Sequence, residues 1–300
     1  MNASSYHPFR SVWAKERYLK YYAHKAERWP VPAQERLVNT SYGQTFVRVG
    51  GVPGAPPLVL LPGGSANSLM WWPNIETFSR SFETYAVDNL YDFGRSVYTR
   101  KPQKQDDILG WLRELFDGLG LHENIHLVGL SLGGWMAGLY ALHCPERLKK
   151  IALLAPANTI LMIHPEFGLR AISALLPWRF FTRSFIYWLF NNLVSKGKAG
   201  KQLADEMVDE MFLSFRCFKP MPVLTPTVFT DNVLQNMIVP ALFLVGENEK
   251  MYAAQAAVQR IHRLAPHWET GIIPSAGHDL TFTQAEMVNK NVTEFFLSSG

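Results

Sequence analysis

The sequence predicts an α/β protein: a mostly parallel, eight-stranded sheet flanked by helices and interrupted by an inserted helical cap. Short, continuously apolar runs such as 57–61 and 240–245 are typical of strands buried on both faces of a parallel sheet. These runs alternate with segments of helical periodicity in a β-α-β-α-β order, which is the pattern of a parallel sheet. The alternation stops near residue 158 and resumes near 237, so we expect the segment between to be an insertion.

Composition and charge limit the class of protein. A chain of 300 residues suits one large α/β domain or a domain with an insertion. The hydrophobic fraction of 48% and the charged fraction of 18% argue against disorder. The net charge of +4 is mild and its charges are scattered, so we expect no nucleic-acid partner. The two cysteines form neither a disulfide framework nor a metal-binding spacing.

A leading helical segment, residues 1–34, precedes the expected core. Apolar residues recur at three- and four-residue steps through 11–29, which indicates a helix. Two roles are open for this helix: it could pack against the sheet edge, or it could act as a gate over the functional site. Two short strands at 36–39 and 45–49 then flank a turn at Tyr42 and form the opening hairpin.

The remaining elements follow in chain order. We expect strands at 57–61, 84–88, 125–128 and 150–154, and helices at 105–117 and 135–143. After the insertion come strands at 240–245 and 269–273 and helices at 253–264 and 284–297. The core therefore comprises residues 35–157 and 237–300, and the cap comprises residues 158–236. Within the cap, a basic loop at 196–201 is expected to precede a helix around 205–215.

Residues 129–133 read Gly-Leu-Ser-Leu-Gly between a predicted strand and a predicted helix. A serine at the tip of such a sharp turn has a strained backbone and is exposed as a nucleophile, so Ser131 is the predicted nucleophile. Gly129 and Gly133 fit because side chains there would clash where the chain passes close to itself, and Gly134 lets the helix pack close to the neighbouring strands. The helix N-terminus leaves backbone N–H groups such as that of Leu132 unpaired and directed at the reacting atom.

A serine hydroxyl needs a base to take its proton, and the base needs an acid that holds it in one tautomer. His278 follows the last predicted strand, a position from which its ring can reach back over the sheet. The acid belongs in the loop after the first strand that follows the cap. Glu249 stands three residues after Gly246 in that loop, and Glu247 is its competitor. Asp279 is expected to point elsewhere and to be solvated.

A glycine-containing loop, Pro62-Gly63-Gly64-Ser65, follows the strand at 57–61. Glycines let the backbone turn its N–H groups toward a developing negative charge. We expect this loop to supply the second donor of an oxyanion hole, from Gly64 or Ser65, beside the first donor on Leu132.

Together these motifs resemble the α/β-hydrolase family over about residues 35–298, and more narrowly the bacterial carboxylesterases of the carboxylesterase NP type. The narrower likeness rests on the leading helix and on residues 72–75, 84–88, 129–134 and 246–252. The resemblance implies an α/β-hydrolase fold. It also supports Glu249, because that group has a glutamate in the acid position. The chain departs from the family at Pro62, where a histidine is usual.

The resemblance implies hydrolysis of a carboxylic ester through an acyl-enzyme intermediate, with Ser131, His278 and Glu249 as the triad. No metal or cofactor is expected, and the sequence contains no HExxH, P-loop or GxGxxG motif. The expected partner is a small-molecule ester with an apolar acyl or aryl group. Other serine-triad reactions remain open, namely those of a thioesterase, a C–C bond hydrolase or a perhydrolase. A ligand-binding homologue with little turnover also remains open.

The cap is rich in large apolar side chains between residues 175 and 190, and no single helical face holds them all. They could pack within the cap, line the acyl site or make transient contact with a lipid surface. The candidates for the acyl site are Trp178, Phe181, Phe185 and Trp188. The chain has no signal-peptide pattern and no run of about 18 apolar residues, so we expect a cytoplasmic protein. The sequence does not indicate an oligomeric state.

Overall fold

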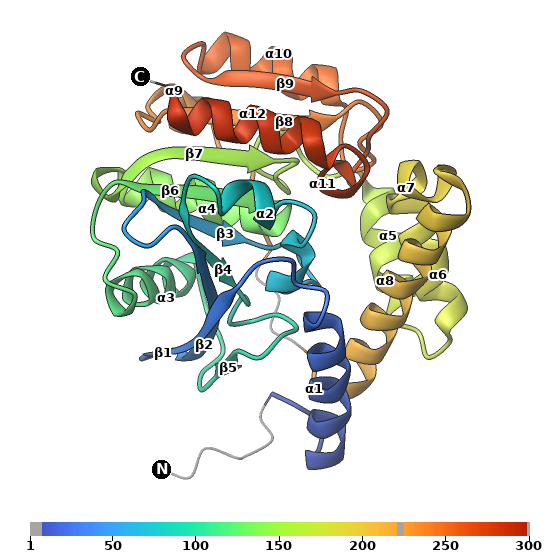
Figure 1. The fold of residues 1–300 in the computed structure, drawn as a ribbon. Coiled ribbons are helices and arrows are strands. Elements are labelled where there is room, and N and C mark those ends of the chain that lie inside the picture. The colour runs from blue at the N-terminus through green and yellow to red at the C-terminus, as the bar shows by residue number, and fades with distance from the viewer. Residues whose placement is uncertain (1–7, 221–224, 299–300) are drawn as a thin grey trace.

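The structure is a computed structural model that describes residues 8–220 and 225–298, and a single sheet forms its centre (Figure 1). In the described residues the sheet has nine strands, in the order β1-β2-β4-β3-β6-β7-β8-β9, with β5 paired to β2. The strands are β1 Ala33–Thr40, β2 Gly43–Gly51, β3 Pro57–Leu61, β4 Glu83–Val87, β5 Val97–Tyr98, β6 Ile125–Leu130, β7 Leu148–Leu154, β8 Ala241–Gly246 and β9 Glu269–Ile273. All eight predicted strands are present.

The pairing of the strands confirms a mostly parallel sheet. β1 and β4 pair antiparallel to β2, while β4, β3, β6, β7, β8 and β9 are parallel to their neighbours in that order. The ninth strand, β5, has only two residues, so it carries no periodicity from which the sequence could have predicted it.

Helices flank the sheet. The longer helices are α1 Val12–Ala26, α3 Gln105–Gly118, α4 Leu132–His143, α5 Pro165–Ala174, α6 Arg179–Leu189, α8 Gly197–Cys217, α10 Ala254–Leu264 and α12 Ala285–Leu297. The short helices are η1 Ser68–Trp71, α2 Ile75–Phe78, η2 Pro145–Arg147, α7 Asn191–Ser195, α9 Asp231–Gln235 and α11 Leu280–Thr283. None of the helices in the described part of the chain has the length and hydropathy that a membrane span requires.

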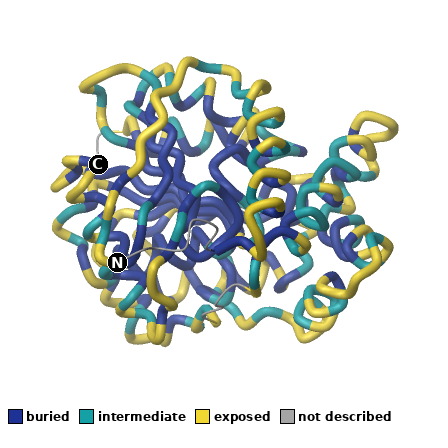
Figure 2. Tube along the Cα trace, turned by 90° about the horizontal axis from the view of Figure 1, so that it is seen from below, coloured by how far each residue is buried: buried dark blue, intermediate teal, exposed yellow. Residues whose placement is uncertain are grey.

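The continuous apolar runs arise because the parallel strands are buried on both faces. In β3, Val59 and Leu61 join the core that packs under α3, α4 and α10, whereas Leu58 and Leu60 join the core under α2 and α12. Neighbouring residues of a strand point to opposite faces, so both faces demand apolar side chains and no alternation remains in the sequence. Figure 2 shows buried residues concentrated along the centre of the molecule and exposed ones on the outer turns and helices.

The segment between β7 and β8 carries α5 to α8, which stand beyond the ends toward which the arrows of β7 and β9 point (Figure 1). These helices share a small core of their own, which contains Phe185, Ile186, Leu189, Ala204 and Val208. Further along the segment the chain returns to the main core, where the side chains of Phe229 and Leu234 are buried.

The expected basic loop at 196–201 is wrong, because α8 is one helix from Gly197 to Cys217. Gly197 has a φ of 81° and forms the junction with α7. Gly200 then sits against the Leu193 carbonyl oxygen, with no room for a side chain. The glycines that suggested a loop therefore permit a tight helix–helix junction.

The leading helix α1 packs on the body of the protein along one side. Tyr18 and Tyr22 are buried with Phe46 of β2 and with Cys217 and Phe218 at the end of α8. Figure 1 shows α1 and α8 lying side by side. This packing agrees with the first of the two roles open from the sequence, and the helix also joins the sheet to the segment between β7 and β8. Tyr21, His24 and Lys25 of α1 also line the cavity described below, so the gate role stays a prediction.

We predict that Gly129→Ala severely destabilises the fold, whereas Gly168→Ala does not. A methyl group on Gly129 would lie 2.1 Å from the Gly133 carbonyl oxygen, but one on Gly168, in α5, would meet nothing within 4 Å. Denaturant unfolding should show a loss of about 3 kcal/mol or more for Gly129→Ala. The free energy of unfolding of Gly168→Ala should equal that of the parent or exceed it by up to about 1 kcal/mol, because alanine favours helix. Equal stability of the two variants would contradict the close approach.

Candidate active site

Ser131 lies at the sharp turn between β6 and α4. Its backbone has φ 54° and ψ −115°, a conformation that costs a non-glycine residue free energy. The turn is held because the Ser131 N–H donates to the Leu154 carbonyl at 2.9 Å and the Ala157 N–H donates to the Ser131 carbonyl at 3.0 Å. Ser131 as a whole is 8% exposed. The strained turn predicted from the sequence is therefore present.

The glycines around the serine have the packing that the sequence predicted. A side chain on Gly133 would lie 2.3 Å from the Leu61 carbonyl oxygen, and one on Gly134 would lie 2.9 Å from Pro156. Because each of these neighbours belongs to another strand end or loop, any residue larger than glycine would push α4 away from the sheet.

His278 and Glu249 meet although they come from different loops. His278 Nδ1 lies 2.9 Å from Glu249 Oε2, in the loops after β9 and β8. The two side chains are 6% and 0% exposed, so the pair is shielded from water. The other oxygen of Glu249 accepts the N–H groups of Lys250 and Met251, which fixes the carboxylate. This arrangement orients the imidazole and leaves its second nitrogen, Nε2, to exchange a proton with another group.

The competing carboxylate, Glu247, has a different position. It is exposed, and its Oε2 accepts the Ser275 N–H at 3.1 Å, in the turn that precedes His278. Of the two glutamates, Glu249 is thus the one in contact with the imidazole.

The environment of His278 shifts its pKa. Burial alone would lower the pKa, but the charge and the hydrogen bond of Glu249, together with the charge of Asp279, raise it above its usual 6.5. Asp279 itself is fully buried, so the expectation that it would be solvated is wrong. Its carboxylate accepts the N–H groups of Leu193 in α7 and of Gly277, which ties the His278 loop to the helices between β7 and β8.

Ser131 and His278 both line a cavity of about 1140 Å³ at the ends of the strands. Apolar side chains from α5, α6 and α8 form one part of its wall, among them Phe167, Ile172, Phe185, Leu189, Met207 and Met211. The cavity can therefore hold a sizeable apolar group next to the serine.

Backbone N–H groups also reach the cavity. Leu132 is the first residue of α4, so its N–H has no partner within the helix. Gly64 lies beside it, since a side chain on Gly64 would be 3.5 Å from Leu132 Cδ2. The Ser65 N–H, in contrast, donates to both carboxylate oxygens of Asp92, at 3.0 and 2.9 Å. Of the two alternatives for the second donor, this favours Gly64.

The four apolar candidates of the helical segment have different positions. Phe185 lines the cavity. Trp178 is 62% exposed and contacts Phe181. Trp188 packs on Phe167 and under the Arg170 guanidinium. Among the described residues, Phe185 is the member of this set that lies in the cavity wall.

Sequence reasoning counted three further residues of that wall in the apolar stretch 175–190 but did not single them out; two belong to α6 and one follows it directly. Ile186, Leu189 and Phe190 line the cavity with Phe185. Their spacing of one, three and four residues marks one side of a helix, so the 3.6-residue period contained the signal. It was hidden because large apolar residues also occupy the other faces of α6.

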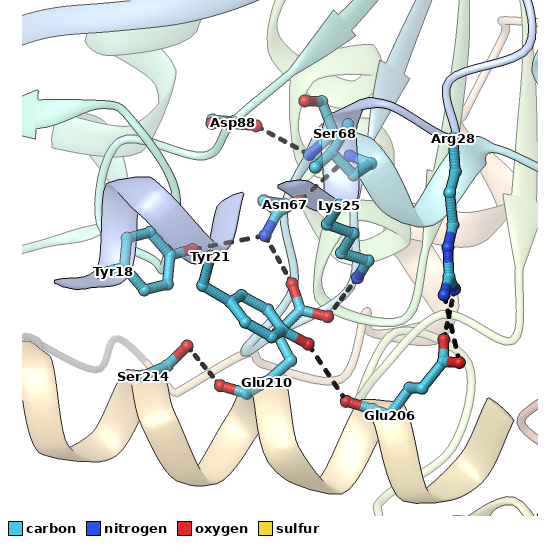
Figure 3. A network of polar contacts seen from close by, with 11 residues as sticks. Tyr18, Tyr21, Lys25, Arg28, Asn67, Ser68, Asp88, Glu206, Glu210 and Ser214 are labelled. Carbon is cyan, nitrogen blue, oxygen red and sulfur yellow. Dashed lines mark hydrogen bonds and ion pairs between the residues drawn. The ribbon is translucent and has the colours of Figure 1, made fainter. Parts of the chain in front are cut away.

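A polar network at the α1 side of the cavity was not predicted either. Lys25 near the end of α1 pairs with Glu210 of α8, and Arg28, just after α1, pairs with Glu206 of α8, as Figure 3 shows. The Asn67 amide donates to Glu210 Oε1 at 2.9 Å. Ion pairs between residues so far apart along the chain leave no short-range pattern, so a single sequence cannot indicate them.

Comparison with known proteins identifies the family. The model of the alpha/beta hydrolase family matches residues 58–290, which is most of the chain. The chain belongs to the alpha/beta hydrolase family. The described fold agrees with this, and the fold class predicted from the sequence is confirmed.

Within the family, proteins similar to this chain include carboxylesterases. The chain is 34% identical to carboxylesterase YbfK of Bacillus subtilis over 96% of both chains. It is 36% identical to the uncharacterized carboxylesterase nap of the same organism, over 93% of this chain and 92% of the relative. The crystal structure of naproxen esterase (carboxylesterase NP) from Bacillus subtilis superposes with a TM-score of 0.85 at 33% identity, covering 94% of this chain and 98% of that one. The predicted resemblance to carboxylesterases is confirmed, and the protein is an esterase-like α/β hydrolase.

We predict that Glu249→Gln lowers ester hydrolysis far more than Glu247→Gln. Replacing the Glu249 carboxylate by an amide would remove the charge that orients and supports the imidazole, so kcat should fall about 100-fold or more. Glu247→Gln, a matched change two residues away, should stay within about threefold of the parent. Both variants would be assayed on one p-nitrophenyl ester.

The pH dependence adds a second readout to the same pair. The sequence predicts His278 as the base, and only its neutral imidazole can take a proton, so kcat/KM of the parent should rise with pH through a midpoint above 6.5. The residual activity of Glu249→Gln should have a lower midpoint, since the charge that raises the pKa of His278 is gone, while Glu247→Gln keeps that of the parent. The reverse ranking of the two variants would move the acid to Glu247.

Proposed function

We propose that the protein hydrolyses carboxylic esters through a Ser131–His278–Glu249 triad and an acyl-enzyme intermediate. One observation carries this proposal: the imidazole lies between a buried carboxylate, 2.9 Å from its Nδ1, and a cavity onto which the strained serine also opens. A nucleophile, a base and an acid that come from three separate loops have little structural reason to meet there.

Each group has a defined role in the reaction. His278 takes the proton of the Ser131 hydroxyl while the oxygen attacks the ester carbonyl carbon. The oxyanion that forms is stabilised by the N–H groups of Leu132 and Gly64. His278 then gives its proton to the leaving alcohol, and the acyl group remains on Ser131.

The second half of the reaction repeats these steps with water in place of the serine hydroxyl and Ser131 as the leaving group. His278 takes a proton from water, the hydroxide attacks the acyl-enzyme, and the carboxylic acid leaves as the proton returns to Ser131. Glu249 remains ionised throughout and supports the imidazolium that appears in both steps.

The proposed substrate is a small-molecule ester with an apolar acyl or aryl group. Support comes from the apolar wall that α5, α6 and α8 give the cavity, since burying an apolar group there removes its surface from water. In this proposal the helical segment 158–236 acts as a cap over the active site, and Phe185 contributes to the acyl-binding surface.

We predict that Ser131→Ala abolishes ester hydrolysis while the thermal unfolding transition stays close to that of the parent. Loss of the nucleophile should lower kcat about 1,000-fold or more, by comparison with other triads. Turnover of a p-nitrophenyl ester and a circular dichroism melt would be measured on the same preparations. Activity within about tenfold of the parent would contradict the assignment.

Pre-steady-state kinetics separates this proposal from a ligand-binding homologue. A burst of p-nitrophenol followed by steady turnover supports an esterase. A stoichiometric burst with no later turnover would favour the binding homologue, because acylation then occurs without hydrolysis.

We predict that Phe185→Ala changes the preference for acyl chain length and that Trp178→Ala does not. Phe185 lines the cavity, whereas Trp178 is largely exposed. In the parent, kcat/KM should rise about fourfold per methylene until the cavity is filled, since one buried methylene contributes about 0.8 kcal/mol. Phe185→Ala should shift the optimum to longer chains.

A series of p-nitrophenyl esters of graded length measures the profile, and Trp178→Ala is the matched control. If Phe185→Ala keeps the parent's profile and only its thermal stability falls, Phe185 is part of the core of the helical segment and the substrate proposal fails.

A further inference from the structure

The turn that carries Gly64 has little stiffness of its own. It contains two consecutive glycines, Gly63 and Gly64, which leave the backbone free to adopt many conformations. The next residue, Ser65, has a φ of 61°, a region that costs a non-glycine residue free energy. The Ala66 N–H donates to the Gly63 carbonyl at 3.3 Å and closes the turn from within. Such a turn keeps a single orientation only when groups outside it hold it.

The loop after β4 supplies those groups. Both carboxylate oxygens of Asp92 accept the Ser65 N–H, at 3.0 and 2.9 Å. The Asn89 amide donates to the Pro62 carbonyl at 3.2 Å. Asp92 is 7% exposed and Asn89 is 1% exposed, so water competes little for these contacts. The two side chains thus hold the backbone by hydrogen bonds on either side of the glycine pair.

These hydrogen bonds limit the directions in which the Gly64 N–H can point. Gly63 and Gly64 share a planar peptide group, so the N–H lies opposite the Gly63 carbonyl that accepts from Ala66. Fixing the following peptide through Ser65 prevents the turn from rotating. Gly64 itself lies in the cavity wall beside Leu132, and in the proposed function its N–H faces the oxyanion from there.

We propose that Asp92 is a positioning residue that holds the Gly64 N–H in the orientation the oxyanion requires. The inference rests on the proposed esterase function, because it concerns the second donor of the oxyanion hole. It assigns to Asp92 no contact with the substrate and no proton transfer.

The segment beyond the turn has separate anchors. The Ser68 N–H donates to Asp88 at 2.8 Å, and the side chain of Asn67 contacts Glu210 and Tyr18, as Figure 3 shows. Because these contacts do not involve Asp92, its replacement should loosen the Gly64 turn and leave η1 in place.

The contact requires a hydrogen-bond acceptor rather than a charge. Burial raises the pKa of Asp92 to about 7, with the N–H groups of Phe93 and Ser65 opposing the rise and the charge of Asp88 adding to it. The neutral carboxyl is therefore well populated near pH 7. An asparagine, which is neutral and has an oxygen in the same place, should perform the same role.

The experiment compares Asp92→Leu, which keeps the size and removes the acceptor, with Asp92→Asn, which keeps one acceptor. We expect Asp92→Leu to lower kcat of the full chain on a p-nitrophenyl ester about 10- to 100-fold, with KM within about threefold. Affinity for an alkyl trifluoromethyl ketone should fall in proportion to kcat/KM, because its serine adduct carries an oxyanion in the same place. Asp92→Asn should restore all three quantities to within about threefold.

Three outcomes would overturn the inference. The first is an Asp92→Leu variant with parent-like kcat. The second is a loss in both variants that follows thermal stability and spares the ketone affinity. The third concerns folding: if Asp92→Leu does not fold, Asp92→Ala takes its place in the assay. Either a folded Asp92→Ala with parent-like kcat or the failure of both variants to fold would make Asp92 a structural residue only. If Ser131→Ala kept its activity, the proposed function itself would fail; if it loses activity while Asp92→Leu keeps it, only the positioning role fails.

Discussion

The close approach of backbone to backbone at the end of β6 is the constraint on which the site depends. A side chain at Gly129 would overlap the Gly133 carbonyl, and one at Gly133 would overlap that of Leu61. With glycine at both positions, β6 can turn directly into α4 and hold Ser131 at the tip with a φ of 54°. The same turn brings the first N–H of α4 next to the loop after β3, so the proposed nucleophile and the two proposed backbone donors lie within one small region.

Parallel strands explain how distant residues join this turn. The carboxyl ends of β3, β6, β8 and β9 lie along one edge of the sheet, and the loops after them carry Gly64, Ser131, Glu249 and His278. The segment between β7 and β8 then covers that edge and supplies the apolar wall. Asp279 joins the two parts, because its buried carboxylate accepts the N–H of Leu193 in α7 next to the proposed base. A shift of α7 would thus act directly on the His278 loop.

Local patterns predicted the fold well, since strand burial and helix periodicity are properties of short stretches. Ser131, His278 and Glu249 could be named because fixed spacings, from a strand end or from a glycine, carry them. Of the four candidates for the acyl site, Phe185 lines the cavity, whereas Trp178, Phe181 and Trp188 do not. The sequence could not separate them, because apolar residues on every face of α6 hide which face meets the cavity. The stretch 196–201 was predicted to be a loop because of its glycines and lysines. Its glycines instead allow a helix junction, in which Gly200 packs on Leu193 of α7, and this contact cannot be predicted from composition. The contacts of Asp92 and Glu210 join residues far apart in the chain, so only the folded structure reveals them.

The central claim is that Ser131 is a nucleophile activated by His278, and mass spectrometry of a labelled enzyme tests it most directly. The protein would be treated with a fluorophosphonate, digested and mapped, in the parent and in His278→Ala. The account predicts one adduct per chain, on Ser131, with the labelling rate lowered about 100-fold or more in His278→Ala, because the serine hydroxyl then lacks its base. An adduct on another residue, or equal labelling rates in the two proteins, would contradict it.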